Sequence, residues 1–398
     1  MPATTEKNLH LSQIAPRIIQ SEIRSMTVEC DAVGGVNMAQ GVCDTPLPEV
    51  VMEAAIQAIR DGYNIYTRLD GVAVLREAIA DKFERHNGLR VDPDKEILVA
   101  SGATGAMSSA CLALFDPGDQ VILFEPFYGY HYSTLVSMRV EPVVVPMEPA
   151  TWEIDFDRLR AAIGPRTRAV MINSPGNPCG KVFTRPELEA IAALAIEHDL
   201  FVLTDEIYEY FIYEGQSHIS PATIPGMAER TITISGISKS YSVTGWRVGY
   251  AVAPPELSVG IRRAHDFVTV GAPHPLQEAA ITALRFPDAY YVGLREGYQK
   301  RRDLLWEYIQ TAGFVAWKPS GAYYILTDAA HFMKAVGVND DYAFAMWLIK
   351  ECGVATVPGS SFYAHTELGR TKIRFCFPKT DDILREAGER LQKLRSLV

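Results

Sequence analysis

Residues 231–247 read Thr-Ile-Thr-Ile-Ser-Gly-Ile-Ser-Lys-Ser-Tyr-Ser-Val-Thr-Gly-Trp-Arg. The first part of this stretch, 231–234, is typical of a strand that is buried on both faces. It leads into a turn of small residues that carries Lys239 and then Arg247. Open α/β sheets bind their ligands just beyond the carboxyl ends of their strands. The stretch therefore predicts an α/β fold with a site at this edge of the sheet.

Further short apolar runs along the chain predict the other strands of the same sheet. Helix-like stretches separate the runs, and the clearest is 184–198, where Thr184 and Glu187 have the spacing of a capping box. Strands that alternate with helices form a mostly parallel sheet with helices on both faces. We therefore predict a doubly wound, seven-stranded sheet. The additional runs are 97–100, 121–124, 143–145, 169–172, 201–204 and 248–252.

The chain has 398 residues, more than a single hydrophobic core usually supports, so two domains are expected. A long helix-like stretch rich in Arg and Lys begins near residue 288, and the N-terminal part of the chain is irregular. We expect a large domain over 48–288. A smaller α+β domain is then formed by 289–398 together with the N-terminal segment 1–47.

The composition excludes several classes of function. The chain has a formal net charge of −10, whereas nucleic acids and anionic membranes bind clustered Lys and Arg. Its six cysteines lack the paired spacing of a zinc site or a disulfide framework. The first 12 residues contain no apolar segment of a signal peptide, and no apolar run approaches the ~20 residues that cross a bilayer. We expect a cytoplasmic protein without a metal, nucleic-acid or membrane partner.

Two turn sequences follow predicted strands. Residues 101–106, Ser-Gly-Ala-Thr-Gly-Ala, are small enough for backbone N–H groups to surround a phosphate, although an ordinary strand-to-helix turn has the same composition. Residues 173–180, Asn-Ser-Pro-Gly-Asn-Pro-Cys-Gly, form a dense turn. Such a turn either holds the amide of Asn177 against a ligand or places this Asn in a left-handed conformation.

Charged residues also follow predicted strands. Asp205 either caps a helix or pairs with a protonated pyridine nitrogen, an interaction worth ~4 kcal/mol at an effective dielectric constant of about 20. Lys239, if held near a cation and away from bulk water, has a lowered pKa and forms Schiff bases, although most lysines are simply solvated. Arg247 offers a planar fork to a phosphate or takes part in a surface ion pair.

Together these motifs resemble the class I and II aminotransferases, the fold type I pyridoxal-phosphate enzymes that are similar to aspartate aminotransferase. The resemblance spans nearly the whole chain. It implies that Lys239 holds pyridoxal 5'-phosphate as a Schiff base and later transfers the substrate proton. It also implies that Asp205 pairs with the pyridinium nitrogen and that Ser238 and Arg247 bind the phosphate.

The same resemblance assigns further residues to the cofactor. Tyr208 and Asn177 are expected at the phenolic oxygen, with Tyr208 among the catalytic residues and Asn177 also close to the substrate. Tyr128 is expected to stack on the cofactor ring, although a core aromatic residue fits its position equally well. Additional phosphate contacts are expected from Gly102, Ala103 and Thr104.

On the substrate side, the resemblance makes Arg374 the fork for the substrate carboxylate and lets Gly41 approach the substrate closely. It places Tyr66 across the interface of a homodimer, on the phosphate of the neighbouring subunit. Residues 42–45, Val-Cys-Asp-Thr, depart from the family pattern and leave the substrate open. Arg68 either meets a distal carboxylate or is solvated.

The function implied by the resemblance is the transfer of an amino group from an α-amino acid to a 2-oxo acid by a ping-pong mechanism. The donor is aromatic, sulfur-containing or acidic. The same residues also serve a lyase that acts on cysteine conjugates or closes the ring of a sulfonium substrate. A non-catalytic effector-binding protein needs a basic DNA-binding module, and a nicotinamide dehydrogenase needs a glycine fingerprint that this sequence lacks.

Overall fold

The central sheet contains seven strands in the order β2-β8-β7-β6-β5-β3-β4. Neighbouring strands are parallel except at β8, which runs antiparallel to both β2 and β7. The predicted mostly parallel, seven-stranded sheet is thereby confirmed. Its strands are β2 (Ile97–Ala100), β3 (Gln120–Glu125), β4 (Glu141–Pro146), β5 (Thr167–Asn173), β6 (Phe201–Asp205), β7 (Thr231–Gly236) and β8 (Gly249–Val252).

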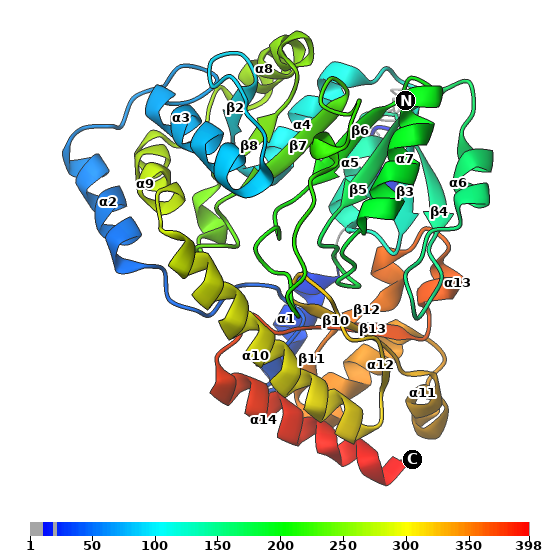
Figure 1. Cartoon of the computed structure of the whole chain (residues 1–398). Coiled ribbons are helices and arrows are strands. Elements are labelled where there is room, and N and C mark those ends of the chain that lie inside the picture. Colours follow the sequence, from blue (N-terminus) through cyan, green and yellow to red (C-terminus); the bar gives the residue numbers. More distant parts are fainter. Residues whose placement is uncertain (1–10, 19–21, 398) are drawn as a thin grey trace, which may run out of the picture.

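Helices cover both faces of this sheet in the computed structural model, which describes residues 11–18 and 22–397 (Figure 1). Val170 of β5 belongs to a core with Leu188 of α7 (Arg185–Glu197). The next residue, Met171, belongs to the core on the other face, with Met107 of α4 (Gly102–Leu114). Both faces are thus buried, which explains why the strands read as continuous apolar runs.

The capping box predicted at the start of α7 is present. The backbone N–H of Glu187 donates to Thr184 Oγ1 at 3.4 Å, and the backbone N–H of Thr184 donates to the Glu187 carboxylate at 2.8 Å. Two N–H groups without partners inside the helix are satisfied in this way, and such a cap typically contributes about 1 kcal/mol.

A second lobe is built around a four-stranded antiparallel sheet, β12-β13-β10-β9. A small parallel pair, β1 and β11, joins the N-terminal part of the chain to this lobe. The long helix α10 (Asp288–Ala312) runs from the first lobe along the second and packs on α14 (Asp381–Leu391) (Figure 1). The strands are β1 (Val36–Asn37), β9 (Val315–Ala316), β10 (Tyr324–Asp328), β11 (Val354–Ala355), β12 (Val357–Pro358) and β13 (Lys372–Cys376).

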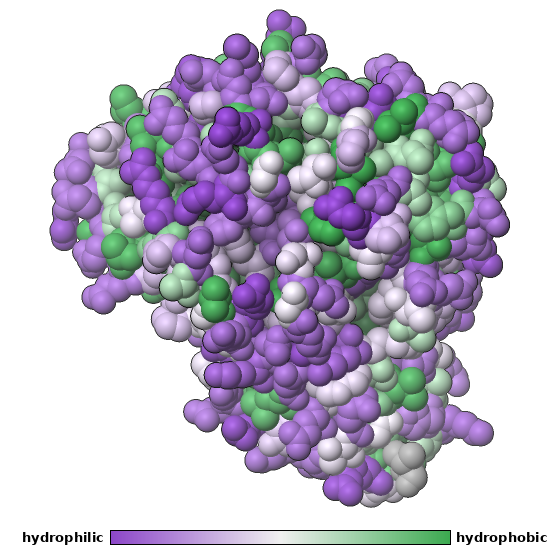
Figure 2. Space-filling model, viewed as in Figure 1, coloured by the Kyte–Doolittle hydropathy of each residue, from purple (hydrophilic) through white to green (hydrophobic). Residues whose placement is uncertain are grey.

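The other helices complete the two lobes, and over the described residues none of the helices is both long and apolar enough to cross a membrane. Hydrophilic side chains cover most of the face in Figure 2. Residues 1–10 of the predicted N-terminal segment lie outside the described residues. The other helices are α1 (Ile23–Ala32), α2 (Glu49–Arg60), α3 (Ala73–Lys82), α5 (Gly129–Ser137), α6 (Phe156–Ala162), α8 (Pro255–Thr269), α9 (His274–Leu284), α11 (Ala330–Val336), α12 (Asp341–Trp347) and α13 (Thr366–Gly369).

Candidate active site

The carboxyl ends of β5, β6 and β7 lie side by side and bring three of the predicted motifs together. Asn173 at the end of β5 pairs with Asp205 at the end of β6. The Asn173 side chain donates to the Asp205 carbonyl at 3.0 Å and accepts from the backbone N–H of Asn177 at 2.9 Å. The turn at 173–180 is therefore fixed to the strand that carries Asp205.

The carboxylate of Asp205 is buried, and both of its oxygens have partners. Oδ2 lies 2.9 Å from Nε2 of His131 on α5, and Oδ1 accepts from the backbone N–H of Ile207 at 3.1 Å. The His131 ring in turn meets the Tyr128 ring edge-on at 5.3 Å. The carboxylate is therefore held in one orientation. His131 was not predicted from the sequence, because its proximity to Asp205 depends on the order of strands in the sheet.

Lys239 follows β7 in a partly buried turn, with Nζ 5.9 Å from the Tyr208 ring centre and 5.6 Å from the Tyr323 ring centre. Burial lowers the pKa of Lys239 below its ordinary value of 10.5, because the charged amine loses its hydration. The charges of Arg374 and Arg247 lower this pKa further. The amine is thus disposed to lose its proton and act as a nucleophile or a base.

Arg374 on β13 is 1% exposed, yet no acidic side chain among the described residues forms an ion pair with it. One nitrogen donates to Asn177 Oδ1 at 2.8 Å, and its guanidinium lies 4.2 Å from the Tyr324 ring centre. Nε is buried without a partner. Because a buried charge without a counter-charge is costly, this site is suited to an anionic ligand.

Residues 39–42, which we call the covering segment, are held by side chains from the second lobe. A Cβ atom on Gly41 would lie 2.6 Å from the Tyr324 hydroxyl, so only glycine fits there. All carbonyls of the segment accept hydrogen bonds: Ala39 from Arg374 at 2.7 Å, Gln40 from the Cys376 thiol at 3.2 Å, Gly41 from the Tyr323 hydroxyl at 3.0 Å and Val42 from Lys379 at 3.5 Å.

The turn between β2 and α4 lies against Arg247. Gly102 has a positive φ of 74°, and a Cβ atom there would overlap the Arg247 guanidinium. Arg247 itself is exposed and donates to the carbonyl of Thr244 at 3.0 Å. Ser238 is buried in the turn before Lys239. A guanidinium close to the first N–H groups of a 13-residue helix forms a suitable environment for a phosphate.

The remaining predicted residues lie at the edges of this site or outside it. Tyr128 is partly buried and stacks on Tyr130 at 5.1 Å. Tyr66 is 85% exposed and packs against little of its own chain. Arg68 binds the carboxylate of Asp70 through two nitrogens, each at 2.6 Å. The guanidinium of Arg68 therefore already has an anionic partner.

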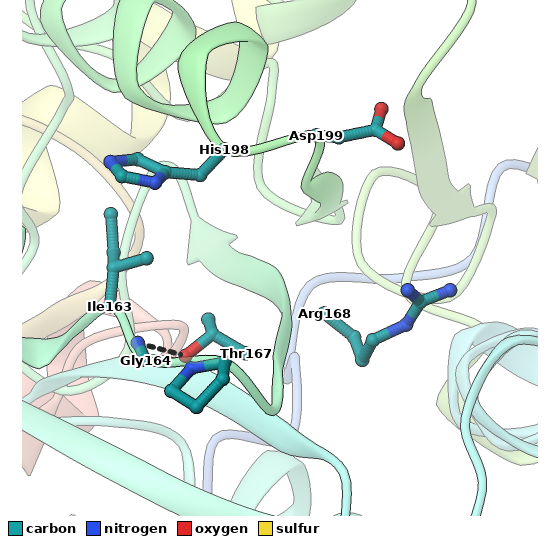
Figure 3. A pocket seen from close by; sticks show the side chains of 7 residues that line it. Ile163, Gly164, Thr167, Arg168, His198 and Asp199 are labelled. Carbon is teal, nitrogen blue, oxygen red and sulfur yellow. Dashed lines mark hydrogen bonds between the residues drawn. The ribbon is translucent and has the colours of Figure 1, made fainter.

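A separate cavity of about 420 Å³ opens at the start of β5 (Figure 3). It is lined by Gly164, Thr167, Arg168, His198 and Asp199, among others, and the backbone N–H of Gly164 donates to Thr167 Oγ1 at 2.9 Å. This end of β5 is opposite to the end that carries Asn173. The cavity is therefore distinct from the cluster around Lys239.

Comparisons with known proteins identify the family of this chain. The profile of the family "Aminotransferase class I and II" matches residues 33–391. The chain belongs to this family. The aminotransferase is 39% identical over 380 residues to the probable N-succinyldiaminopimelate aminotransferase DapC of Mycobacterium tuberculosis, with 93% of this chain and 94% of the relative covered. It is 34% identical to human kynurenine–oxoglutarate transaminase 1, with 90% and 92% covered.

A solved structure shows the same fold. The N-succinyldiaminopimelate aminotransferase structure from Mycobacterium tuberculosis has a TM-score of 0.92 and 37% identity, and the match covers 97% of this chain and 100% of that one. The predicted family and fold type are thereby confirmed. The protein is an aminotransferase, an enzyme that moves an amino group from an α-amino acid to a 2-oxo acid.

Proposed function

We propose that this aminotransferase uses pyridoxal 5'-phosphate and that Lys239 binds it covalently through Nζ. The observation that carries the proposal is the convergence of three groups: the Lys239 amine, the buried Asp205 carboxylate and the buried Arg374 guanidinium, which lacks an acidic partner among the described residues. Both Asp205 and Arg374 are close enough to change the pKa of Lys239.

The residues around Lys239 fit this cofactor at both of its ends. The close approach of Gly102 to Arg247 puts a guanidinium beside the first turn of α4, whose N–H groups have no partner inside the helix, and this combination suits the phosphate. Asp205, held by His131, suits the protonated ring nitrogen. We assign the phosphate to Gly102, Ala103, Thr104, Ser238 and Arg247, the phenolic oxygen to Asn177 and Tyr208, and the ring face to Tyr128.

The mechanism assigns a separate task to each residue of the site. The bound cofactor supplies an electron sink for the charge that develops at the substrate Cα. Arg374 binds and orients the substrate carboxylate, with Asn177 beside it. The neutral amine of Lys239 takes the proton from Cα and would deliver it to a carbon of the bound cofactor. Its lowered pKa supports this role. Asp205, held by the His131 ring, would pair with the ring nitrogen of the bound cofactor.

We also propose a homodimer in which Tyr66 completes the site of the partner. Ile65 and Tyr66 are neighbours in the chain and are 77% and 85% exposed, and adjoining exposed apolar side chains are typical of an interface. His274 Nδ1 lies 3.0 Å from the Ile65 carbonyl and ties this segment to α9. All six cysteines are free and buried, which supports the proposed cytoplasmic location. We retain the division into domains at residues 47 and 288 as part of the proposal.

Absorbance spectroscopy tests the cofactor assignment. The purified protein is expected to be yellow, to lose its visible absorption band on borohydride treatment, and to lack that band as Lys239→Ala. A band that survives in this variant would refute the assignment of Lys239. A second assay, with an amino acid and 2-oxoglutarate, distinguishes transamination from elimination. Stoichiometric ammonia and pyruvate without a new amino acid would indicate a lyase.

Subunit mixing tests the shared site. A heterodimer of a Lys239→Ala chain and a Tyr66→Ala chain contains one site that has both Lys239 and Tyr66. If Tyr66 acts across the interface, mixing the two weakly active variants after reversible dissociation restores part of the wild-type activity. If Tyr66 acts within its own chain or not at all, mixing restores none.

A further inference from the structure

Glu125, the last residue of β3, has a carboxylate that is completely buried. One oxygen accepts from the backbone N–H groups of Ala364 at 2.9 Å and His365 at 3.3 Å, and the other binds Nδ1 of His365. A buried carboxylate is stable only when such donors surround it. All three donors belong to one short loop, 239 and 240 residues further along the chain. The Glu125 carboxylate therefore holds this loop in place through three hydrogen bonds.

The loop carries an aromatic side chain to the predicted substrate site. The carbonyl of Phe362, in the short helix η6 (Gly359–Phe362), accepts from the backbone N–H of Phe127 at 2.9 Å. The Phe362 ring is 3% exposed and lies 4.8 Å from the Arg374 guanidinium. Glu125 and Phe127 thus fix the loop at two points, with Phe362 held against the residue that we assign to the substrate carboxylate.

A small cavity lies between this loop and the start of α5. None of the described residues that line it is acidic or basic; the lining side chains are mainly aromatic and include the stacked pair Tyr128 and Tyr130 together with Phe362 and Tyr363. Phe362 borders both this cavity and Arg374, so a substrate whose carboxylate binds Arg374 lies beside the aromatic lining. Because the cavity is only about 40 Å³, a large substrate side chain enters it when these rings move apart. Arg68, the residue that could meet a distal carboxylate, instead binds Asp70 through two nitrogens at 2.6 Å and does not line this cavity.

We propose that Glu125 is a positioning residue that determines substrate specificity. By holding the loop at 361–365, it keeps Phe362 and Tyr363 in place as the apolar wall of the substrate side-chain pocket. The enzyme accordingly selects amino donors with uncharged aromatic or thioether side chains over dicarboxylic ones. The inference rests on the proposed function, since it takes Arg374 as the carboxylate site.

The test compares wild type with Glu125→Gln, which keeps the shape of the side chain and removes its charge. Wild type is expected to turn over phenylalanine and methionine with kcat/KM at least about tenfold above that of aspartate. In Glu125→Gln the KM for phenylalanine rises about tenfold with kcat changed less than about threefold, since weakened hydrogen bonds to a charged group displace the wall and not the reacting atoms. Titration with 3-phenylpropanoate, which lacks the amine, reports the same loss as weaker binding.

Two further variants keep the test decisive. His365→Ala removes one donor at a half-exposed position and is expected to raise the same KM about threefold, even if Glu125→Gln does not fold. Glu141→Gln, an exposed acid of β4 paired with Arg166, is the matched control and leaves binding unchanged. Unchanged 3-phenylpropanoate binding in both Glu125→Gln and His365→Ala, or a wild-type preference for aspartate, would overturn the inference. A wild type without the visible absorption band would instead overturn the proposed cofactor.

Discussion

The two sides of the active site are built in different ways. The cofactor side consists of turns that directly follow strands of one sheet, at 101–104, 173–180, 205–208 and 236–247. The substrate side is assembled from separate parts of the chain: the covering segment at 39–42 is held by side chains between 323 and 379.

Because of this difference, the residues that determine the type of reaction and those that determine the choice of substrate depend on different parts of the sequence. Each turn on the cofactor side can be recognised from one short stretch of sequence, because a strand end and the turn after it are continuous in the chain. The substrate side depends on contacts such as the one between Tyr323 and Gly41, which are 282 residues apart. The reaction type is therefore encoded in local motifs, whereas the choice of substrate depends on how distant segments pack.

The largest expected effect is on the cofactor side. Lys239→Ala removes both the covalent attachment and the base, so kcat is expected to fall by on the order of 10⁴-fold or more. Steady-state assays with added cofactor and excess amino acid measure this loss. Lys350→Ala, at an exposed lysine of the second lobe, is the control. Residual activity within about tenfold of wild type would show that another amine performs the reaction.

On the substrate side, Arg374→Lys is expected to have the next largest effect. It keeps the charge but loses the planar fork that Asn177 and Ala39 hold in place. The KM of both the amino acid and the 2-oxo acid is expected to rise by on the order of 10²-fold, because both bind through a carboxylate. A change in only one of the two KM values would contradict a common carboxylate site.

His131→Phe weakens the cofactor side without touching a predicted motif. It leaves one oxygen of the buried Asp205 without its partner, at a cost of about 1–3 kcal/mol. The dissociation constant of the cofactor is expected to rise about 10- to 100-fold, as measured by equilibrium dialysis. The control, His198→Ala, lies in the separate cavity of Figure 3 and leaves this constant unchanged.

The extent of prediction from the sequence depends on whether a feature rests on neighbours in the chain or on distant segments. The strands, the capping box of Thr184 and the positions of Asp205 and Lys239 after strands could be predicted, since each depends on neighbours in the chain. The contact between His131 and Asp205 could not, because it requires β3 and β5 to be adjacent in the sheet. The role of Glu125 could not be predicted either, since its three hydrogen-bond donors come from a loop that is distant in the sequence.

The lowered pKa of Lys239 predicts how the cofactor side responds to pH. In the cofactor-free protein, only the deprotonated amine reacts with the cofactor aldehyde, so the rate of reconstitution rises with pH as the amine loses its proton. Because burial lowers this pKa, the rate is expected to level off below pH 10.5. Stopped-flow absorbance over a pH series measures it. A midpoint at or above 10.5 would mean that the amine is solvated.

The smallest effect is expected at the covering segment, where Tyr323→Phe removes a single hydrogen bond to the Gly41 carbonyl. A neutral hydrogen bond contributes about 1 kcal/mol, so the KM of the amino acid is expected to rise about fivefold while the visible spectrum stays unchanged. The other carbonyls of the segment keep their partners, Arg374, Cys376 and Lys379, which limits the loss. A shift in the spectrum would show that Tyr323 acts on the cofactor side instead, since its ring also lies 5.6 Å from Lys239 Nζ.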